Sequence, residues 1–500
     1  MQLATSRLID ALSRLWPETP PPSLAAPEVR LCLDSRALDP GDVFVALPGV
    51  AADGRDHIDA ALAAGAALVL CHVGDGRVCP EAPGVVALEG LRERLGELGR
   101  ALFAVPDALE LVGVTGTNGK SSVTHYLAEL SLALGVDAGV IGTLGHGRPG
   151  ALAEGGLTTP GPLALQAALG ELAAAGIGRV AMEVSSHALE QGRLDGCRVK
   201  AAVFTNLSRD HLDYHGGMAA YAAAKARLFR REELELAVVN GDDPLARLML
   251  AGLPAGVRVL ASGRDEAVTL RVLERFPHGT GQRALVATPD GERELALPLV
   301  GRFNLDNVLL AMATLHGLGH DLAALFAAAA ELSPVPGRME ILARPGAPAV
   351  VIDYAHTPDA LDNALAALRD HLPGSGRLWC LFGCGGDRDP GKRPLMAAAA
   401  ERHADRLVIT DDNPRGEDPE AIRRQVLAGL SPAARGQAWV MDGRGVAIAR
   451  TLAEAGAEDV VLIAGKGHET YQEIAGVRHP FSDRDAAGRA LAARAGEGAP

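Results

Sequence analysis

The sequence predicts an α/β protein of three domains: a small N-terminal α/β domain, a central domain with a doubly wound, mainly parallel sheet, and a C-terminal α/β domain. Three observations support this class. The chain has 500 residues, which is more than one hydrophobic core ordinarily serves. Short apolar runs alternate with helical patterns, as in parallel sheets. Connections rich in turn residues divide the chain into residues 1–106, 107–333 and 334–500.

Composition and charge exclude several classes of function. Hydrophobic residues make up 48% and charged residues 22%, which is typical of a soluble globular protein. The net charge of −14 argues against a non-specific nucleic-acid binder. The N-terminus lacks a basic start followed by an apolar core, and no apolar run is long enough to cross a membrane. We therefore expect a cytoplasmic monomer that acts on small molecules, with no nucleic-acid partner and no membrane insertion.

The cysteines favour the same compartment. Six cysteines are too few and too scattered for a disulfide framework, which favours a reducing cytoplasm. Cys380 and Cys384 are spaced like half of a metal site. Because no second close pair accompanies them, we favour buried thiols.

The N-terminal domain begins after a proline-rich connector at residues 17–27. Short strands are predicted at residues 29–34 and 42–47, followed by a helix at 58–64 and a strand at 67–71. On composition alone, Asp34-Ser35-Arg36 is a turn.

The central domain opens with a glycine-rich loop that has the character of a phosphate cradle. The loop follows an apolar run at residues 109–114 and precedes a helical pattern, so its backbone N–H groups and the helix N-terminus can face an anion. The spacing departs from the strict P-loop pattern, because Val114 occupies the first-glycine position. Lys120 supplies a positive charge and Ser121 a hydroxyl for Mg²⁺. The residues of this P-loop are Thr115, Gly116, Thr117, Asn118, Gly119, Lys120 and Ser121.

Polar side chains follow the later strands of this domain, predicted at residues 138–141, 179–184, 201–206 and 236–240. Glu183 and His211 come after successive strands, where ligands of parallel sheets collect, and both are candidates to reach a cation over the phosphates. Lys225 lies in a helix, where lysine is ordinarily a surface charge. Asn304 and Asn307 share one helix face, which suits either helix capping or ligand contact.

The C-terminal domain begins at the linker Pro334-Val335-Pro336-Gly337-Arg338. Its predicted strands, residues 349–353, 378–382, 406–410 and 459–464, alternate with helices, which indicates a Rossmann-like unit. A glycine cluster from residue 383 lacks the spacing of a dinucleotide fingerprint, so NAD is rejected.

Four motifs, in this order, resemble those of the Mur ligases. They are Gly-Thr-Asn-Gly-Lys-Ser, Glu183-Val184-Ser185-Ser186-His187, the run from Asn206 to Asp213, and Ala224-Lys225. The resemblance implies ATP as co-substrate, bound by the P-loop with Asn304, Asn307, Arg338 and Asp353. It also implies a CO₂-derived carbamate on Lys225, and Mg²⁺ held by Ser121, Glu183, His211 and the carbamylated Lys225. Lys120, Glu183, His211 and Lys225 are then the catalytic candidates.

Two C-terminal clusters resemble those of the family members that add meso-diaminopimelate. The resemblance places the amino acid against Arg388, Asp412, Asn413, Pro414, Arg415, Gly465 and Glu469. Diaminopimelate differs from lysine by a second carboxylate, which a guanidinium can hold with two parallel hydrogen bonds. Glu469 suits an ammonium group.

The same resemblance assigns the second substrate, a UDP-muramyl dipeptide. The uridine nucleotide falls on Leu33, Ser35, Val50, Ala51 and Ala52, and the muramyl peptide on Thr158, Thr159, Ser185, Gln191 and Arg193. Two departures stand out. Leu157 occupies a position where the family pattern has Asn, and residues 50–52 are less polar than expected, which favours backbone contacts.

The implied reaction is ATP-dependent formation of an amide on UDP-N-acetylmuramoyl-L-alanyl-D-glutamate through an acyl phosphate, in peptidoglycan precursor synthesis. Three alternatives remain. They are a lysine-adding Mur ligase, a folylpolyglutamate-type ligase, and, from another class, a nucleotide-dependent binding module or switch.

Overall fold

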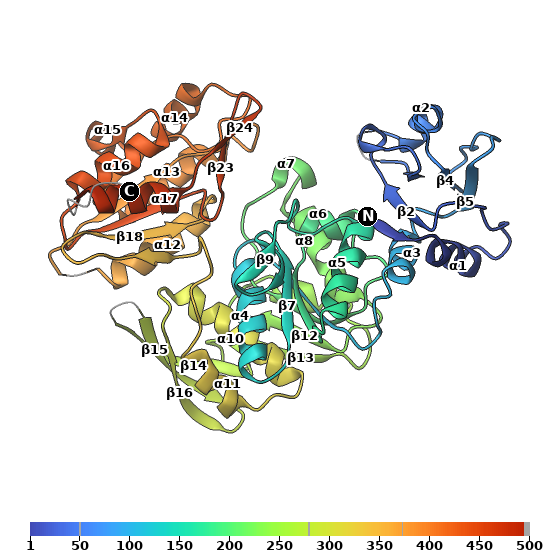
Figure 1. Cartoon of the computed structure of the whole chain (residues 1–500). Helices are drawn as coiled ribbons and strands as arrows, with labels where there is room; N and C mark the ends of the chain where they lie inside the picture. Colours follow the sequence, from blue (N-terminus) through green and yellow to red (C-terminus); the bar gives the residue numbers. More distant parts are fainter. Residues whose placement is uncertain (50–51, 279–280, 373, 495–500) are drawn as a thin grey trace. The chain divides into compact units, whose positions relative to one another are not determined.

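The computed structural model describes residues 1–49, 52–278, 281–372 and 374–494 (Figure 1). The chain divides into two compact units, the first formed by residues 1–113 and 136–200 and the second by residues 114–135 and 201–500. Both units contain parallel strands that alternate with helices, so the predicted α/β class is confirmed. The boundaries of the three predicted domains stay predictions.

The first unit begins with a five-stranded sheet in the order β1-β2-β3-β4-β5. β1 is antiparallel to β2, and the other neighbours are parallel. Alternate residues of β3 and β4 enter different apolar clusters, so both faces of this sheet are covered. The elements are β1 (Gln2–Ala4), α1 (Thr5–Leu15), β2 (Glu28–Cys32), β3 (Val43–Ala46), α2 (Ile58–Ala63), β4 (Leu68–Val73), β5 (Val85–Glu89) and α3 (Leu95–Leu102).

A second group of strands in the first unit follows the order β6-β10-β7-β8-β9. β6 is also the strand through which the chain passes into the second unit. β10 is parallel to β7, and β7, β8 and β9 form an antiparallel meander. The elements are β6 (Glu110–Thr115), β7 (Ala138–Gly142), β8 (Gly145–Arg148), β9 (Ala151–Ala153), α5 (Pro162–Ala174), β10 (Arg179–Glu183) and α6 (Ser186–Glu190).

In the second unit, β11, β12, β13 and β14 are parallel neighbours in this order, followed by the antiparallel strands β15 and β16. The sequence analysis did not predict β13 to β16, in which buried and exposed residues mix because one face is open to solvent. The elements are α4 (Lys120–Ala133), β11 (Val199–Phe204), α7 (Leu212–His215), α8 (Met218–Ala226), β12 (Leu236–Asn240), α9 (Ala246–Leu250), β13 (Arg258–Gly263), β14 (Leu270–His278), β15 (Gly281–Thr288), β16 (Gly291–Leu297), α10 (Arg302–Gly317) and α11 (Leu322–Ala329).

The C-terminal part of the second unit contains a six-stranded sheet in the order β17-β18-β22-β19-β20-β21, parallel except for β17. One apolar cluster packs α12, α13 and α14 on this sheet, and another packs α16 and α17. The elements are β17 (Glu340–Leu342), β18 (Ala349–Asp353), α12 (Pro358–Asp370), β19 (Leu378–Phe382), α13 (Lys392–His403), β20 (Arg406–Ile409), α14 (Pro419–Leu427), α15 (Pro432–Gln437), β21 (Trp439–Val440), α16 (Arg444–Glu454), β22 (Val460–Ala464), β23 (Tyr471–Ile474), β24 (Val477–Pro480) and α17 (Asp483–Arg494).

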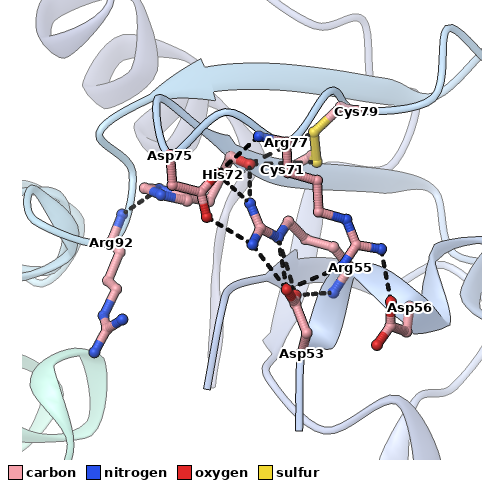
Figure 2. Close-up of a disulfide and its surroundings, with 9 residues drawn as sticks. All are labelled: Asp53, Arg55, Asp56, Cys71, His72, Asp75, Arg77, Cys79 and Arg92. Atoms are coloured by element: carbon pink, nitrogen blue, oxygen red, sulfur yellow. Dashed lines mark hydrogen bonds and ion pairs between the residues drawn. A yellow bond between two sulfur atoms is a disulfide. The ribbon is translucent and has the colours of Figure 1, made fainter. Parts of the chain in front are cut away.

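The cysteines differ in part from expectation. Cys71 on β4 and Cys79 in the following loop form a disulfide (Figure 2), a single cross-link that the scattered cysteine spacing did not predict. The loop folds back over the end of β4 and brings Cys71 and Cys79 together, although their separation of 8 residues is not typical of a paired motif. Cys380 and Cys384 are buried thiols, as predicted. Among the described residues, no helix is both long and apolar enough to span a membrane.

Candidate active site

The loop between β6 and α4 has the backbone geometry of an anion-binding turn. Gly116 has a φ of 151° and Gly119 a φ of 85°, both in the region that favours glycine. A Cβ atom on Gly119 would lie 2.5 Å from Asn307 Oδ1, so a larger residue does not fit. The helix α4 starts at Lys120, directly after the turn. The loop and the helix N-terminus can therefore offer several N–H groups to a phosphate.

The chain after β11 fixes the shape of this loop. Thr205 Oγ1 donates to the Asn118 carbonyl at 2.6 Å, and Asn118 N donates to Asn206 Oδ1 at 3.0 Å. Thr117 N donates to the Asn206 carbonyl at 2.9 Å, and Thr117 Oγ1 accepts from Ser208 N at 3.0 Å. The sequence analysis gave Thr205 and Asn206 no role, although their place after a buried strand was a signal.

Two lysines face the loop from different elements. Lys120 Nζ donates to the carbonyls of Gly116 and Thr117, at 3.1 and 2.8 Å. Lys225 Nζ, on α8, donates to the Gly116 carbonyl at 2.6 Å and lies 4.6 Å from the centroid of the Tyr221 ring. Lys225 is 1% exposed, so it is not the surface charge typical of a helix lysine. Burial, and then the charge of Lys120, lower the pKa of Lys225 well below its ordinary value.

His211 lies near these lysines, in the segment between β11 and α7. Its Nε2 atom is 3.3 Å from Asp210 Oδ2. Desolvation is the main cause that lowers the pKa of His211 to about 4, and Lys120 and Lys225 act in the same direction. The imidazole is therefore neutral at pH 7, the form in which its nitrogen can ligate a metal.

In the first unit, polar side chains gather around the end of β10. Glu183 is buried, with Oε1 accepting from Thr143 N at 2.9 Å and Oε2 from Thr143 Oγ1 at 3.2 Å. Thr158 Oγ1 is 3.0 Å from Thr143 Oγ1. Thr159 Oγ1 donates to the Glu183 carbonyl at 2.8 Å and accepts from Ser185 N at 3.0 Å. The carboxylate of Glu183 is thus held in one orientation, and Thr143 is a participant that sequence reasoning missed.

Two further predicted peptide-binding residues belong to the same cluster. Arg193 Nη1 donates to the Thr159 carbonyl at 2.7 Å, and its Nε and Nη2 atoms donate to Gln191 Oε1 at 3.0 and 2.7 Å. The structure therefore brings Thr158, Ser185 and these residues to one strand end. Leu157 is 55% exposed, so no buried polar contact is made there.

A cavity of about 300 Å³ lies beside the glycine-rich loop in the second unit. Its wall includes five predicted nucleotide contacts, namely Asn118, Gly119, Asn307, Arg338 and Asp353. Other lining residues were missed, although most follow a strand end or open α10. They include Asn206, Asn240, Asp243, Phe303, Asp306 and Tyr354.

Asn304 does not line this cavity. Its Oδ1 accepts from the Tyr126 hydroxyl at 3.1 Å, and its Nδ2 donates to the Val300 carbonyl at 2.8 Å. These bonds tie the start of α10 to α4. The sequence analysis left capping and ligand contact open for this residue, and the described contacts of its side chain are with protein groups.

Arg338 connects the C-terminal part of the second unit to the start of α4, and Asp353 lies beside it in the cavity wall. Arg338 Nη2 donates to Ser121 Oγ at 3.1 Å, and its guanidinium lies 4.3 Å from the centroid of the Tyr354 ring. Asp353 Oδ2 accepts from Met339 N at 2.8 Å. Burial raises the pKa of Asp353 to about 6, against the lowering effect of Arg338.

The predicted amino-acid pocket is formed where β20 and β22 end. A Cβ atom on Gly465 would lie 2.6 Å from Asp412 Oδ2, which shows how closely the two loops approach. Asn413 Nδ2 donates to Glu469 Oε2 at 2.9 Å. The structure thus brings four predicted residues from two loops together.

Arg415 is held at the edge of this pocket. It has a φ of 51°, and its Nη1 donates to the Gly386 carbonyl at 2.8 Å. A Cβ atom on Gly386 would lie 1.9 Å from the Pro414 carbonyl oxygen, so the glycine loop packs directly on this turn. Arg415 Nε is 3.7 Å from Glu473 Oε2, a partner on β23 that sequence reasoning missed. Arg388 is exposed, and its Nη1 donates to the Asp387 carbonyl.

The predicted uridine-binding residues lie around β2 and β3. Leu33 is 45% exposed, and Ser35 opens a short 3₁₀ helix capped by Asp34. Ala52 is exposed, whereas Val50 and Ala51 lie outside the described residues.

An ion-pair network links the residues that follow Ala52 to the loop after β4 (Figure 2). The Arg55 guanidinium donates to Asp53 Oδ2 and to Asp75 Oδ2, each at 2.7 Å. Arg77 donates to Asp53 and to Asp56. The loop that the disulfide closes, which carries Asp75 and Arg77, is thereby joined to the chain that follows Ala52.

The described residues contain no group of three or more His, Cys, Asp or Glu side chains that could hold a metal ion. Mg²⁺ usually takes one or two carboxylates together with waters and substrate phosphates. The hydroxyl of Ser121 and the buried carboxylate of Glu183 are hard oxygen donors of this kind. The residues present therefore fit Mg²⁺ better than a metal that needs an all-protein cage.

Three family models match successive parts of the chain. They are described as the Mur ligase family catalytic domain over residues 30–101, the Mur ligase middle domain over residues 114–315, and the Mur ligase glutamate ligase domain over residues 337–467.

Curated relatives and a solved structure extend this similarity over most of the chain. A UDP-N-acetylmuramoyl-L-alanyl-D-glutamate--2,6-diaminopimelate ligase of Pseudomonas aeruginosa is 50% identical over 465 residues, covering 93% of this chain and 95% of the relative. A protein of the same name from Chromobacterium violaceum is 49% identical, covering 94% and 95%. A solved structure under that name is 39% identical, with a TM-score of 0.66 and coverage of 93% and 95%.

Proposed function

This chain belongs to the Mur ligase family, and we propose that it is an ATP-dependent, ADP-forming ligase that adds meso-2,6-diaminopimelate to the D-Glu γ-carboxylate of UDP-N-acetylmuramoyl-L-alanyl-D-glutamate. The observation that carries the proposal is Arg415, fixed by the Gly386 carbonyl and three residues after Asp412, whose neighbour Asn413 bonds Glu469. A guanidinium there can hold the second carboxylate of diaminopimelate, and carboxylates beside it can hold an ammonium. The names of the curated relatives support the same substrate.

ATP is assigned to the glycine-rich loop and the adjacent cavity. The loop from Thr115 to Ser121 receives the phosphates, through the backbone N–H groups that Asn206 does not already bond and through the Lys120 ammonium, because the glycine turn leads directly into the N-terminus of α4. Asn307, Arg338 and Asp353 face the nucleoside end, supported by their place in the cavity wall. Asn304 holds the start of α10 in place through its hydrogen bonds to protein groups. We propose that it also contacts ATP.

Mg²⁺ is assigned to Ser121, Glu183, His211 and a carbamylated Lys225. When bound, the ion would supply positive charge that offsets the repulsion between the phosphates and the attacking carboxylate. The neutral Lys225 amine attacks CO₂, forms an N–C bond and loses one proton, which leaves a carbamate anion. Its burial and lowered pKa support this step, because the neutral amine is the nucleophile.

The reaction then proceeds in two displacements. The γ-carboxylate of D-Glu attacks the γ-phosphorus, ADP leaves, and an acyl phosphate forms. The diaminopimelate amine attacks the acyl carbon, phosphate leaves, and the amine gives up its proton as the amide forms. Lys120 stabilises the charge on the transferring phosphoryl group, and exclusion of water protects the acyl phosphate from hydrolysis.

The UDP-muramyl dipeptide is assigned to the first unit. Leu33, Ser35 and residues 50–52 receive the uridine nucleotide. The cluster of Thr158, Thr159, Ser185, Gln191 and Arg193 receives the peptide, supported by its hydrogen-bond network around Glu183. Because ATP and UDP-linked precursors are cytoplasmic metabolites, we propose that the enzyme works in the cytoplasm, as a monomer.

The test is release of phosphate from ATP in the presence of the UDP-muramyl dipeptide, with meso-diaminopimelate, L-lysine or no amino acid. We expect release with diaminopimelate alone. Arg415→Ala should raise the KM for diaminopimelate about 10- to 100-fold, the effect of losing one charge-assisted pair. Arg489→Ala, which removes an exposed arginine on α17, is the matched control and should behave as wild type.

The other outcomes separate the alternatives. Release with lysine would favour a lysine-adding ligase and overturn the role of Arg415. Release only with a folate substrate and glutamate would favour a folylpolyglutamate-type ligase. ATP binding without amino-acid-dependent ADP release would favour a nucleotide-dependent switch.

A further inference from the structure

Lys466 is a buried lysine between two residues of the proposed amino-acid pocket. It follows β22, and its side chain is 0% exposed. Its Nζ donates to Glu469 Oε2 at 2.6 Å and to Asn413 Oδ1 at 3.0 Å. A lysine ammonium has three donor positions, so two of them serve residues assigned to diaminopimelate.

The three side chains form a closed hydrogen-bonded triangle. Asn413 Nδ2 donates at 2.9 Å to the same Glu469 Oε2 that accepts from Lys466. Asn413 Oδ1 also accepts from Glu473 N at 2.9 Å. The orientation of the Asn413 amide is therefore fixed, because its oxygen faces two donors and its nitrogen faces a carboxylate.

This arrangement distinguishes the two oxygens of Glu469. Oε2 receives two donors, whereas Oε1 has no donor among the described residues. The Glu469 side chain is 16% exposed, so part of it is open to solvent while Lys466 is fully buried. An incoming ammonium would therefore meet Oε1, while Oε2 of the same carboxylate is already held by Lys466 and Asn413.

We propose that Lys466 is a positioning residue for amino-acid selection, which acts through Glu469 and Asn413 and rests on the function proposed above. Because Lys466 is inaccessible, it does not touch the substrate. It holds the carboxylate of Glu469 in the orientation in which Oε1 faces the ammonium group of the amino acid. Without this cation, a largely buried carboxylate would be left with one neutral donor.

The test is steady-state kinetics of Lys466→Met, with each of the three substrates varied in turn. We expect the KM for diaminopimelate to rise about 10-fold or more, the effect of leaving a buried polar group unpaired. The KM values for ATP and for the UDP-muramyl dipeptide should stay within about 2-fold, since neither contacts this triangle. Lys200→Met is the matched control, because Lys200 lies in the first unit and pairs with Glu110. Equal rises in all three KM values would overturn the proposal.

A double-mutant cycle with Glu469→Gln tests whether Lys466 acts through Glu469. We expect Lys466→Met/Glu469→Gln to bind diaminopimelate no more weakly than Glu469→Gln alone. Additive losses would overturn the proposal. If Lys466→Met does not fold, Lys466→Gln retains a donor without the charge and should give the same selective rise in KM.

The wild-type assay separates this inference from the proposed function. No diaminopimelate-dependent phosphate release by the wild type would overturn the function and the inference together. Wild-type activity with unchanged kinetics of Lys466→Met would overturn the inference alone.

Discussion

The two most deeply buried lysines of the molecule lie in different chemical surroundings. Lys225 is 1% exposed, and its Nζ meets the Gly116 carbonyl and the Tyr221 ring. Lys466 is 0% exposed, and its Nζ meets a carboxylate oxygen of Glu469 at 2.6 Å. In the described part of the chain, no carboxylate lies within 4.0 Å of Lys225 Nζ. Burial alone therefore does not decide what a lysine does.

The partner decides between two kinds of chemistry. A buried amine without a counter-ion is favoured in its neutral form, which is a nucleophile. A buried amine bonded to a carboxylate is favoured as a fixed cation, which orients its partner. Lys225 accordingly suits covalent modification by CO₂, and Lys466 suits the positioning of Glu469.

The largest expected effect is the loss of activity on removal of the Lys225 amine. Lys225→Ala should lower kcat about 100- to 1,000-fold, the cost of losing one preorganised electrostatic group. Added formate should restore part of the activity, because a small carboxylate can occupy the place of the carbamate. Lys225→Arg introduces a permanent positive charge and cannot form a carbamate, so it should stay inactive with or without formate.

Activity of Lys225→Ala close to that of wild type would contradict the catalytic role of the Lys225 carbamate. Mass spectrometry of the wild type in bicarbonate buffer adds an independent readout, a mass increase of one CO₂ on the peptide that contains Lys225. Lys466, as a paired ammonium, should show no such increase.

The second prediction concerns the free energy of unfolding, to which Lys466 should contribute more than Lys225. Lys466→Met leaves Glu469 and Asn413 without their shared donor, so it should lower the free energy of unfolding by about 1–3 kcal/mol. The measurement is urea unfolding followed by fluorescence of Trp379 and Trp439, whose ring centroids lie 5.4 Å apart in the C-terminal part of the second unit. An unchanged midpoint would show that the triangle is not a stabilising unit.

The sequence alone predicts the surroundings of neither lysine. The P-loop and the Asp-Asn-Pro-Arg cluster are local patterns that the sequence shows directly, whereas the binding roles assigned to their residues stay predictions. The environment of Lys225 is not local, because Gly116 is distant in the chain and the alanines beside Lys225 carry no chemical signal. Its role came from family resemblance.

Other features were missed for the same physical reason. Thr143 is 40 residues from Glu183, and Glu473 is 60 residues from Asn413, so only the fold reveals these contacts. The disulfide between Cys71 and Cys79 depends on how a loop folds back over β4. Strands such as β14 and β16 escaped prediction because their solvent-facing side breaks up the apolar run.

The third prediction is that Lys225→Met hardly changes stability. The substitution removes one hydrogen bond to the Gly116 carbonyl, which costs about 0.5–1.5 kcal/mol, but it also ends the burial of a polar amine. The two terms oppose each other, and the net change in the free energy of unfolding should be within about 1 kcal/mol. Urea unfolding followed by circular dichroism measures it. A loss as large as that of Lys466→Met would contradict the distinction between the two sites.

The smallest effect is expected for Lys200→Met, where a lysine is paired but partly exposed. Lys200 Nζ lies 2.6 Å from Glu110 Oε1, and the two side chains are 35% and 25% exposed. Solvent screens this pair, and Arg179 remains bonded to the same carboxylate, so the loss should be about 0.5 kcal/mol.

The pH dependence of the loss of stability in Lys200→Met tests whether the charge of the Lys200–Glu110 pair is its cause. Burial raises the pKa of Glu110, but hydrogen bonds from Lys200 and Arg179 outweigh it, and the net pKa is lowered. A lowered carboxyl pKa contributes stability above the pKa of the unfolded chain and loses it as the pH falls through the folded value. The difference between wild type and Lys200→Met should therefore be present at pH 7 and vanish in acid. A difference that persists in acid would show that packing of the lysine stem, rather than its charge, stabilises this site.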